Sequence, residues 1–316
     1  TSDEPYRFFA QSKQSCSGAD NLVLSNVYDC LLRLEADGSL TPALAESYEV
    51  SDDGLEYTFH LRKGVKFHNG QEMTAEDVKF SYDYGFEGPI GTALFVNYKQ
   101  CDIIDEYTVK MTLSSPYAAF PYGVASRLGG IACKAYFDEV GDDEYVKNPI
   151  GTGPYKFVQW TLGDNLTFVK NEDYFDKDHM PTITNMTWRI IPEGSSRTIG
   201  LETGELDLVI DVDQNGVKRL ESEDGISVTS LAGTRISFMV MNSQRAPFDN
   251  ISFRKAVNAA VDRSAVLAVA AGDMGEISIS PNPQVFAGST LENTTDYSPE
   301  LASKYLEESG IDPESV

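Results

Sequence analysis

The residue types that most often carry chemistry are few and scattered in this chain. Its three histidines, His60, His68 and His179, have no second histidine one helical turn away and no neighbouring cysteine. A metal site or a general base needs such partners, so we expect all three histidines to be structural or solvated. The nucleophile elbow G-x-S-x-G, the P-loop and the H-E-x-x-H motif are also absent from the sequence. The residue pattern therefore predicts no enzyme, no cofactor and no metal site.

Two stretches come close to known ligand-binding motifs. Residues 151–155, GTGPY, begin like a dinucleotide fingerprint, but Pro154 follows and the third glycine is missing, so we expect a tight turn. Residues 211–222, DVDQNGVKRLES, place acidic and amide side chains at the first three ligand positions of a calcium loop. The last position holds Ser222 where a bidentate glutamate is needed, and an apolar strand leads into the stretch instead of a helix. We interpret it as a strand-to-helix turn with an acidic helix start.

The sequence does not determine whether the four cysteines are free thiols or form disulfides. They are Cys16, Cys30, Cys101 and Cys133, and their spacing is not that of a zinc site. Four thiols permit three disulfide pairings, and buried reduced thiols acting as small hydrophobic side chains are an equally weighted alternative. Among the pairings we favour Cys101 with Cys133, because both end apolar, strand-like segments of one region.

The overall charge narrows the classes of partner. The 316 residues carry a formal net charge of −24, which disfavours nucleic acid and anionic membranes as partners. Hydrophobic residues make up 41% of the chain, as in a folded globular protein, and the length is typical of about two domains. No apolar run approaches the roughly 18 residues of a membrane-spanning helix. The N-terminal stretch has no basic and apolar leader, which indicates a cytosolic protein or a signal peptide outside the sequence.

Hydrophobic periodicity and turn signals predict a mixed α and β chain without internal repeats. The clearest helix start follows Asn69-Gly70, where Thr74 and Asp77 form a variant of the capping box. Further helices are expected at residues 22–35, 117–130, 195–203, 250–272 and 298–310. Strands are expected within 45–67, in a hairpin around Asp105-Glu106, and at 154–160, 165–171, 185–192, 205–210 and 235–242.

The longest stretch with clear turn and capping signals resembles a known protein family. Residues 40–84, LTPALAESYEVSDDGLEYTFHLRKGVKFHNGQEMTAEDVKFSYDY, resemble the signature of the family 5 extracellular solute-binding proteins, the peptide- and nickel-type receptors of bacterial ABC importers. Further similar stretches follow in the family's order and span nearly the whole chain: NPIGTGPYKFVQW, NEDYF, GELDLVIDV, MNSQRAPFDNISFRKAVNAAVDR and YSPELASKYLEESGI. A scaffold that holds a ligand needs no reactive side chain, which agrees with the absence of catalytic motifs.

The resemblance implies an α/β fold of the type II periplasmic-binding-protein kind, in which two lobes close over a ligand. The first lobe would comprise residues 1–40 and 149–245, with an α+β subdomain of residues 41–148 inserted into it. Residues 246–316 would form an incomplete second lobe, because the family's usual sequence continues well past Val316. We therefore interpret the chain as a fragment of a longer receptor.

The resemblance also implies the function. The ligand, preferably a di- or oligopeptide, would stabilise the closed state of the two lobes, and the closed receptor would deliver it to an ABC transporter permease. A nickel or other metal chelate or a sugar is the alternative ligand, and a ligand-sensing domain of a larger signalling protein is the alternative role. The family implies a monomer at the extracellular face of the cytoplasmic membrane or in the periplasm. It would be anchored as a lipoprotein through a cysteine upstream of Thr1.

The same resemblance indicates seven candidate ligand contacts: Ser17, Gly18, Asn21, Arg127, Gly129, Phe238 and Asn242. The first three belong to SCSGADN, which precedes VYDCLL as the family's ligand-facing loop precedes its equivalent helix. The next two follow SPYAAFPYGVAS, where some members contact a ligand carboxylate. The last two flank the crossing between the lobes. Each position also has a plain structural explanation as a turn, a surface charge or core packing.

Overall fold

The computed structural model describes most of the chain: residues 5, 18–88, 91–92, 95–231, 233, 236–272, 274–278 and 296–312. The chain divides into two compact units, Thr1–Ser196 and Arg197–Val316, and each unit is described by itself. No helix in these described ranges is long and apolar enough to cross a membrane. The lobe and subdomain boundaries expected from the family resemblance stay a prediction.

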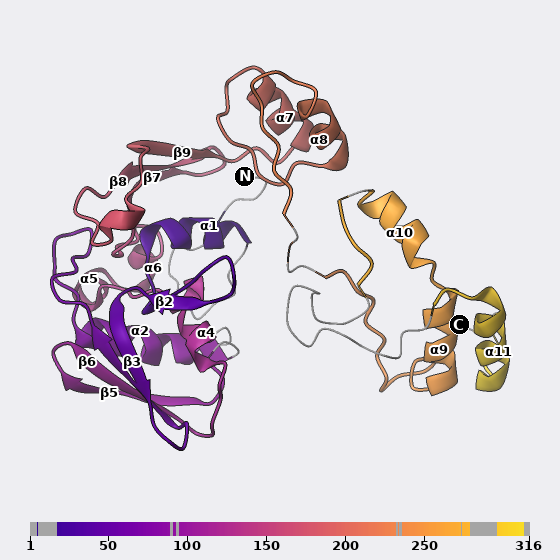
Figure 1. Cartoon of the computed structure of the whole chain (residues 1–316), viewed down its shortest axis with the longest axis horizontal. Helices are drawn as coiled ribbons and strands as arrows, with labels where there is room; N and C mark the ends of the chain where they lie inside the picture. Colours follow the sequence, from indigo (N-terminus) through magenta and orange to yellow (C-terminus); the bar gives the residue numbers. More distant parts are fainter. Residues whose placement is uncertain are drawn as a thin grey trace. The chain divides into compact units, whose positions relative to one another are not determined.

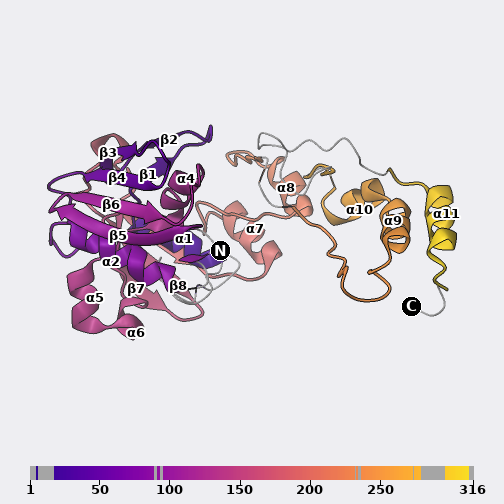
Figure 2. The same cartoon turned by 90° about the horizontal axis from the view of Figure 1, so that it is seen from below.

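The first unit contains a four-stranded antiparallel sheet with the strand order β3-β4-β6-β5. Its strands are β3 (Ala45–Val50), β4 (Glu56–Leu61), β5 (Tyr98–Asp105) and β6 (Thr108–Leu113). Every second residue of β4 and β6 is buried, as in a sheet with one face on a core. Helix α2 (Ala75–Phe86) packs on this sheet with Val78 and Tyr82 in the shared core (Figures 1 and 2). The strands expected within 45–67 and the hairpin are thus confirmed.

Helix α2 begins where the capping signal predicts. Thr74 is its N-cap, and the Thr74 N–H donates to Asp77 Oδ2 at 2.9 Å. The other carboxylate oxygen of Asp77 accepts the N–H of Lys134 at 2.9 Å, at the start of α5 (Lys134–Val140). One capping side chain therefore joins two helices that are distant in the sequence.

The helix expected over residues 22–35 is wrong in its second half. Helix α1 spans Gly18–Val27, and the chain then enters β1 (Leu32–Leu34), which pairs antiparallel with β2 (Leu40–Pro42). Where the helix ends, the carbonyl of Val27 accepts the N–H of Gly153 at 2.9 Å. A long-range hydrogen bond thus takes the place of the next helical turn, and apolar spacing alone carries no information about such a bond.

A second antiparallel sheet in the first unit has three strands, β7 (Tyr155–Thr161), β8 (Asn165–Lys170) and β9 (Asn185–Arg189), which confirms three predicted strands. It shares a core with α1 through Leu24, Val27, Leu166 and Phe168. Short helical segments connect the parts of this unit: α4 (Phe120–Val124), η1 (Arg127–Gly129), α5, α6 (Asp142–Tyr145) and η2 (Lys177–His179).

The helices from α7 onward are α7 (Gly194–Glu202), α8 (Gln214–Leu220), α9 (Ile251–Ala260), α10 (Arg263–Ala270) and α11 (Pro299–Ser309). Helix α7 ends just before Gly204 and α11 just before Gly310, and both glycines have positive φ. Helices α9 and α11 pack against each other.

Three expectations for the second unit are wrong. Residues 250–272 form two helices, because Asp262 caps α10 by accepting two backbone N–H groups. The described residues of the expected strands at 205–210 and 235–242 are not in strands, and both segments are exposed, with Leu208 at 76% and Phe238 at 74%. A strand needs a neighbour that pairs with its backbone, and β-rich apolar composition alone does not supply one.

Candidate functional site

Four of the candidate ligand contacts lie on two short elements that pack against each other. Gly18 and Asn21 belong to the first turns of α1, and Arg127 and Gly129 belong to η1. The expectation that Gly18 and Asn21 lie in a loop is therefore wrong, because both are helical. Ser17 lies outside the described residues. The fold thus brings together two backbone segments that are far apart in the sequence.

The segment around η1, residues 126–132, is held by hydrogen bonds from two sides. On one side the N–H of Ile131 donates to the main-chain carbonyl of Asp29 at 3.0 Å, and the Cys30 thiol donates to the Ser126 carbonyl at 3.0 Å. On the other side the N–H of Ala132 donates to Ser81 Oγ of α2 at 2.9 Å. The 126–132 segment is therefore fixed between the end of α1 and the middle of α2.

Packing accounts for the glycine at position 129. A Cβ at Gly129 would lie 2.6 Å from the carbonyl oxygen of Val124, which is closer than real Cβ contacts come. The N–H of Gly129 also donates to the Ser126 carbonyl at 2.6 Å and closes the η1 turn. The tight turn requires a glycine here whether or not a ligand touches it.

Ser126 lies in the same segment and is not among the candidates predicted from the sequence. Its Oγ is buried and has no hydrogen-bond partner among the described residues. A buried hydroxyl without a partner costs free energy, so it marks a position where a further polar group is favoured. In the sequence it is an ordinary loop serine, and nothing in its neighbours distinguishes it.

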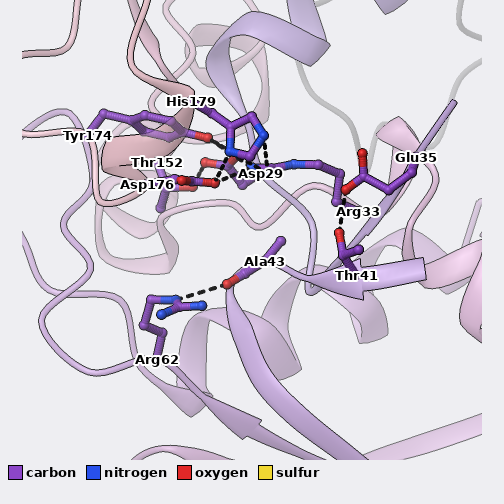
Figure 3. Close-up of polar contacts among 10 residues, drawn as sticks. All are labelled: Asp29, Arg33, Glu35, Thr41, Ala43, Arg62, Thr152, Tyr174, Asp176 and His179. Carbon is purple, nitrogen blue, oxygen red and sulfur yellow. Dashed lines mark hydrogen bonds and ion pairs between the residues drawn. The ribbon is translucent and has the colours of Figure 1, made fainter. Parts of the chain in front are cut away.

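A polar cluster lies beside the end of α1 (Figure 3). The Asp29 carboxylate accepts the hydroxyls of Thr152 and Tyr174, each at 2.9 Å. Desolvation raises the pKa of Asp29 to about 6, against the opposing effects of the two hydroxyl hydrogen bonds and of Arg33. Asp29 is not among the residues predicted from the sequence, although a single acid inside the apolar run VYDCLL is a signal that could have indicated it.

Arg33 extends this cluster toward the loop before β9. Its Nη2 lies 2.8 Å from Asp176 Oδ2, and His179 Nδ1 lies 2.9 Å from the same oxygen, as Figure 3 shows. Desolvation works against the charge of Asp176, but the hydrogen bonds from Arg33 and His179 outweigh it and lower the pKa of this carboxyl. The cluster therefore joins β1 to the 171–180 loop and has the composition of a structural ion pair, without a nucleophile.

The stretch GTGP, residues 151–154, bends over the end of α1. A Cβ at Gly151 would lie 2.0 Å from the Val27 carbonyl oxygen, and one at Gly153 would lie 2.6 Å from that of Asn26. His68 Nε2 donates to the Gly153 carbonyl at 3.0 Å, and Asn171 Nδ2 donates to it at 3.1 Å. The glycines here permit backbone to approach backbone, as expected for a tight turn.

The sequence predicts that all three histidines are structural or solvated, and the contacts of His68 and His179 agree with this. Burial lowers the pKa of His68 to about 4, so this side chain is neutral while it supports the glycine segment. His179 is largely exposed at the edge of the Asp176 ion pair, and His60 is half-buried in β4. None of the three faces a cysteine in the contacts of the described residues.

The favoured disulfide is wrong. Cys101 and Cys133 are both buried free thiols, and Cys30 is also free. The Cys133 thiol donates to Gln71 Oε1 at 2.9 Å, and burial raises the pKa of Cys101 to about 12. Cys16 lies outside the described residues. The three cysteines that the structure describes are therefore reduced; Cys101 and Cys133 are buried, as the alternative expected, and Cys30 is partly buried.

The calcium-like stretch is the start of a helix. Asp213 is the N-cap of α8 and accepts the N–H of Gly216 at 2.8 Å, and the carbonyl of Asp211 accepts a hydrogen bond from Arg197 at 3.0 Å. The helix start is confirmed, whereas the strand before it is not formed. Across the described part of the chain, no group of three or more His, Cys, Asp or Glu residues could hold a metal ion.

The remaining two candidates, Phe238 and Asn242, belong to the second unit. Both are exposed, and Asn242 Oδ1 accepts the N–H of Gln244 at 3.0 Å, which is a local turn contact. Their role as ligand contacts stays a prediction.

Comparison with known proteins gives a consistent assignment. A family model described as bacterial extracellular solute-binding proteins, family 5 Middle, matches residues 39–315. The glutathione-binding protein GsiB of Pectobacterium atrosepticum is 31% identical over 291 residues, which cover 91% of this chain and 56% of GsiB. Heme-binding protein A of Haemophilus influenzae is 29% identical over 316 residues, with 92% of this chain and 57% of that protein covered.

A solved structure agrees with this result. The periplasmic binding protein DppA of Helicobacter pylori, in complex with the peptide STSA, matches with a TM-score of 0.86 at 29% identity. The match covers 95% of this chain and 64% of DppA. The chain therefore has the mixed α/β fold of a periplasmic binding protein and spans 56% to 64% of the length of GsiB and DppA.

Proposed function

Because the chain belongs to the bacterial extracellular solute-binding proteins of family 5, we propose that it captures a small ligand and delivers it to the permease of an ABC importer. The match over residues 39–315 carries this proposal. The ligand class is a di- or oligopeptide, which the resemblance to a glutathione-binding protein and to a peptide-bound structure supports. Such a protein binds and releases its ligand without chemical change, so we propose that it is not an enzyme.

The first-unit part of the binding site is the face formed by α1 and the 126–132 segment. Gly18 and Asn21 contribute from α1, and Arg127 and Gly129 contribute from η1. A guanidinium presents a planar pair of donors that matches a carboxylate, so Arg127 is the group proposed to hold the peptide carboxylate. Ser126 adds a hydroxyl without a partner among the described residues. Ser17, Phe238 and Asn242 complete the proposed set.

The proposed mechanism is closure of two lobes. Residues 1–40 and 149–245 form the first lobe, residues 41–148 are a subdomain inserted into it, and residues 246–316 belong to the second lobe. A ligand that contacts both lobes favours the closed state by its difference in affinity for the two states. The protein is proposed to act as a monomer outside the cytoplasmic membrane, held there by a lipid on a cysteine upstream of Thr1.

Native mass spectrometry and calorimetry test the ligand class. The protein purified without refolding is expected to carry a mass consistent with a peptide. Calorimetry with di- and tetrapeptides, glutathione, haem and a nickel–histidine chelate then ranks the ligands, with peptides expected to bind most tightly. Tighter binding of haem or of the chelate would contradict the peptide proposal, and turnover of any probe in a peptidase assay would contradict the proposal of a non-enzyme.

The role of Arg127 is tested with a double comparison. Arg127→Lys is expected to weaken peptide binding roughly tenfold to a hundredfold, the cost of one charge-assisted hydrogen bond. Arg62→Lys is the matched control, because Arg62 donates to the carbonyl of Ala43 and not to the 126–132 segment. A peptide with an amidated C-terminus should bind the wild type weakly and be insensitive to Arg127→Lys. Equal losses for both peptides would refute a carboxylate contact.

A further inference from the structure

One carboxylate joins three segments beside the proposed binding face. Asp29 Oδ2 accepts the hydroxyl of Thr152 in the glycine segment, and Asp29 Oδ1 accepts the hydroxyl of Tyr174 in the 171–180 loop, both at 2.9 Å. Thr152 and Tyr174 are themselves buried at 1% and 2% exposure, so neither hydroxyl has bulk water as an alternative. The side chain of Asp29 is thus fixed in position by two donors from different elements.

The main chain at the same position holds the 126–132 segment. The Asp29 carbonyl accepts the N–H of Ile131, and the Cys30 thiol donates to the Ser126 carbonyl, each at 3.0 Å. A shift of the Asp29 backbone would therefore move both ends of the segment that carries Arg127. The geometry connects two buried hydroxyls, which are outside the binding face, to the part of the face that is proposed to contact the ligand.

The charged and titratable groups around Asp29 come from every neighbouring element. Arg33 of β1 lowers the pKa of Asp29, whereas Asp176 beside η2 raises it. Tyr174 and Thr152 stabilise the ionised form by hydrogen bonding, and His179 contacts Asp176. His68 supports the Thr152 segment through the Gly153 carbonyl, and Cys30 is adjacent in the chain. Desolvation exceeds these effects, so ionisation of the Asp29 carboxylate costs free energy in the folded protein. We call Asp29 with its partners Thr152 and Tyr174 the joint.

We propose that Asp29 is a positioning residue for the binding site: through Thr152 and Tyr174 it fixes the backbone that holds the 126–132 segment in place. The inference rests on the proposed function of that segment. Local opening of the joint exposes the carboxylate to water, where its ordinary pKa returns. The closed joint then binds a proton more tightly than the open one, with a pKa of about 6 against about 3.8.

The sign of the pH effect follows from this difference. Between pH 3.8 and about 6 the closed joint is protonated while the opened joint is ionised. Opening therefore becomes easier as the pH rises through this window and stays easy above it, whereas acidification tightens the joint. The two hydroxyls matter most above the window, because a hydrogen bond to a charged acceptor is about twice as strong as one to a neutral acceptor.

Hydrogen exchange in the full chain tests the proposal without a ligand. Protection factors, corrected for the intrinsic pH dependence of exchange, are measured for residues 126–132 and for the control strands β3 and β4 from pH 4 to 8. Tyr174→Phe and Thr152→Val are each expected to lower the protection of the 126–132 segment roughly tenfold at pH 7.5, with a smaller loss at pH 4.5. Asp29→Asn mimics the neutral carboxyl, so the loss of protection with rising pH that Asp29 causes should disappear in this variant, and only the opposite change from His68 should remain.

A matched variant and a ligand measurement decide between the outcomes. Tyr107→Phe removes one hydroxyl from a contact with Glu72, away from the Asp29 contacts, and should leave residues 126–132 unchanged. Equal losses in the segment and in β3 and β4, or a pH profile unaltered by Asp29→Asn, would overturn the proposal. Peptide calorimetry separates the two hypotheses. If the protein binds no peptide but the variants still change the protection of residues 126–132, the proposed function is wrong, whereas the role of Asp29 in positioning this segment is supported.

Discussion

The carbonyl of Val27 accepts the N–H of Gly153 at 2.9 Å, and this bond joins the end of α1 to the segment that leads into β7. A Cβ at Gly153 would lie 2.6 Å from the Asn26 carbonyl oxygen and 2.6 Å from the Val27 carbonyl carbon. Both neighbours are backbone atoms, so neither can move away as a flexible side chain would. The contact explains why the stretch GTGP needs glycine without any phosphate to bind.

Gly153→Ala should therefore destabilise the protein by about 1–3 kcal/mol or more, the cost of overpacking a tight contact. Urea unfolding followed by circular dichroism measures the loss. Gly38→Ala is the control, because Gly38 has a positive φ but no atom within 4 Å of a built Cβ, so it reports backbone strain alone. The cost of that strain is about 1–2 kcal/mol. A smaller loss for Gly153→Ala than for Gly38→Ala would contradict the close approach.

Asp77 is expected to stabilise the fold through two backbone contacts. Asp77→Ala removes the acceptors of the Thr74 and Lys134 N–H groups and should cost about 1–3 kcal/mol. Asp77→Asn keeps one acceptor oxygen, so it should recover part of the loss. The midpoints of urea unfolding compare the three proteins, and an alanine variant as stable as the wild type would rule out the two-helix link.

Two buried groups near the same glycine segment should respond to pH in opposite directions. Asp29 has a raised pKa, of about 6 against 3.8, so its contribution to stability is present at low pH and is lost as the pH rises through this window. His68 has a lowered pKa, of about 4 against 6.5, because burial disfavours its charged form. Its contribution is present above pH 6.5 and is lost as the pH falls toward 4.

Single variants separate the two contributions. Relative to the wild type, Asp29→Asn should lose stability more steeply between pH 6.5 and 4, because the opposing carboxyl is gone. His68→Gln should lose less over the same range, and its amide can still donate to the Gly153 carbonyl. Thermal unfolding at half-unit pH steps provides the curves. Parallel curves for the three proteins would show that neither group titrates in the joint.

The described cysteines are expected to react slowly in the folded protein. The thiols of Cys101 and Cys133 are buried, and burial raises both pKa values, which keeps the nucleophilic thiolate scarce. Iodoacetamide labelling read by mass spectrometry should modify both residues in denaturant and leave them largely unmodified without it. A Cys101–Cys133 cross-linked peptide in a non-reduced digest would contradict this prediction.

The sequence alone predicts helix ends that are marked by capping residues a few positions away. The capping pair Thr74 and Asp77 predicted the start of α2, and the helices expected at 195–203 and 298–310 match α7 and α11 to within one residue at each end. The break between α9 and α10 also had a local signal that was missed, because Asp262 followed by Ser264 is a good N-cap. Capping, turns and periodicity depend on neighbours a few residues away, so the chain encodes them without its tertiary context.

The candidate site was predictable only in part. The family resemblance indicated Gly18, Asn21, Arg127 and Gly129, and their two elements do pack together. Ser126 and the hydroxyl partners of Asp29 gave no sequence signal, because a buried unpaired hydroxyl or a long-range hydrogen bond is a property of neighbours in space.

The sequence by itself determined the alternation of helix and strand, the capped helix ends and the absence of a recognisable catalytic motif. Only the tertiary structure decided that α1 stops at Val27, that Asp29 turns toward Thr152 and Tyr174, and that Cys101 and Cys133 stay apart. Local signals act over a few residues through backbone geometry. Desolvation and long-range hydrogen bonds depend on which distant segments meet, and that is established when the core closes.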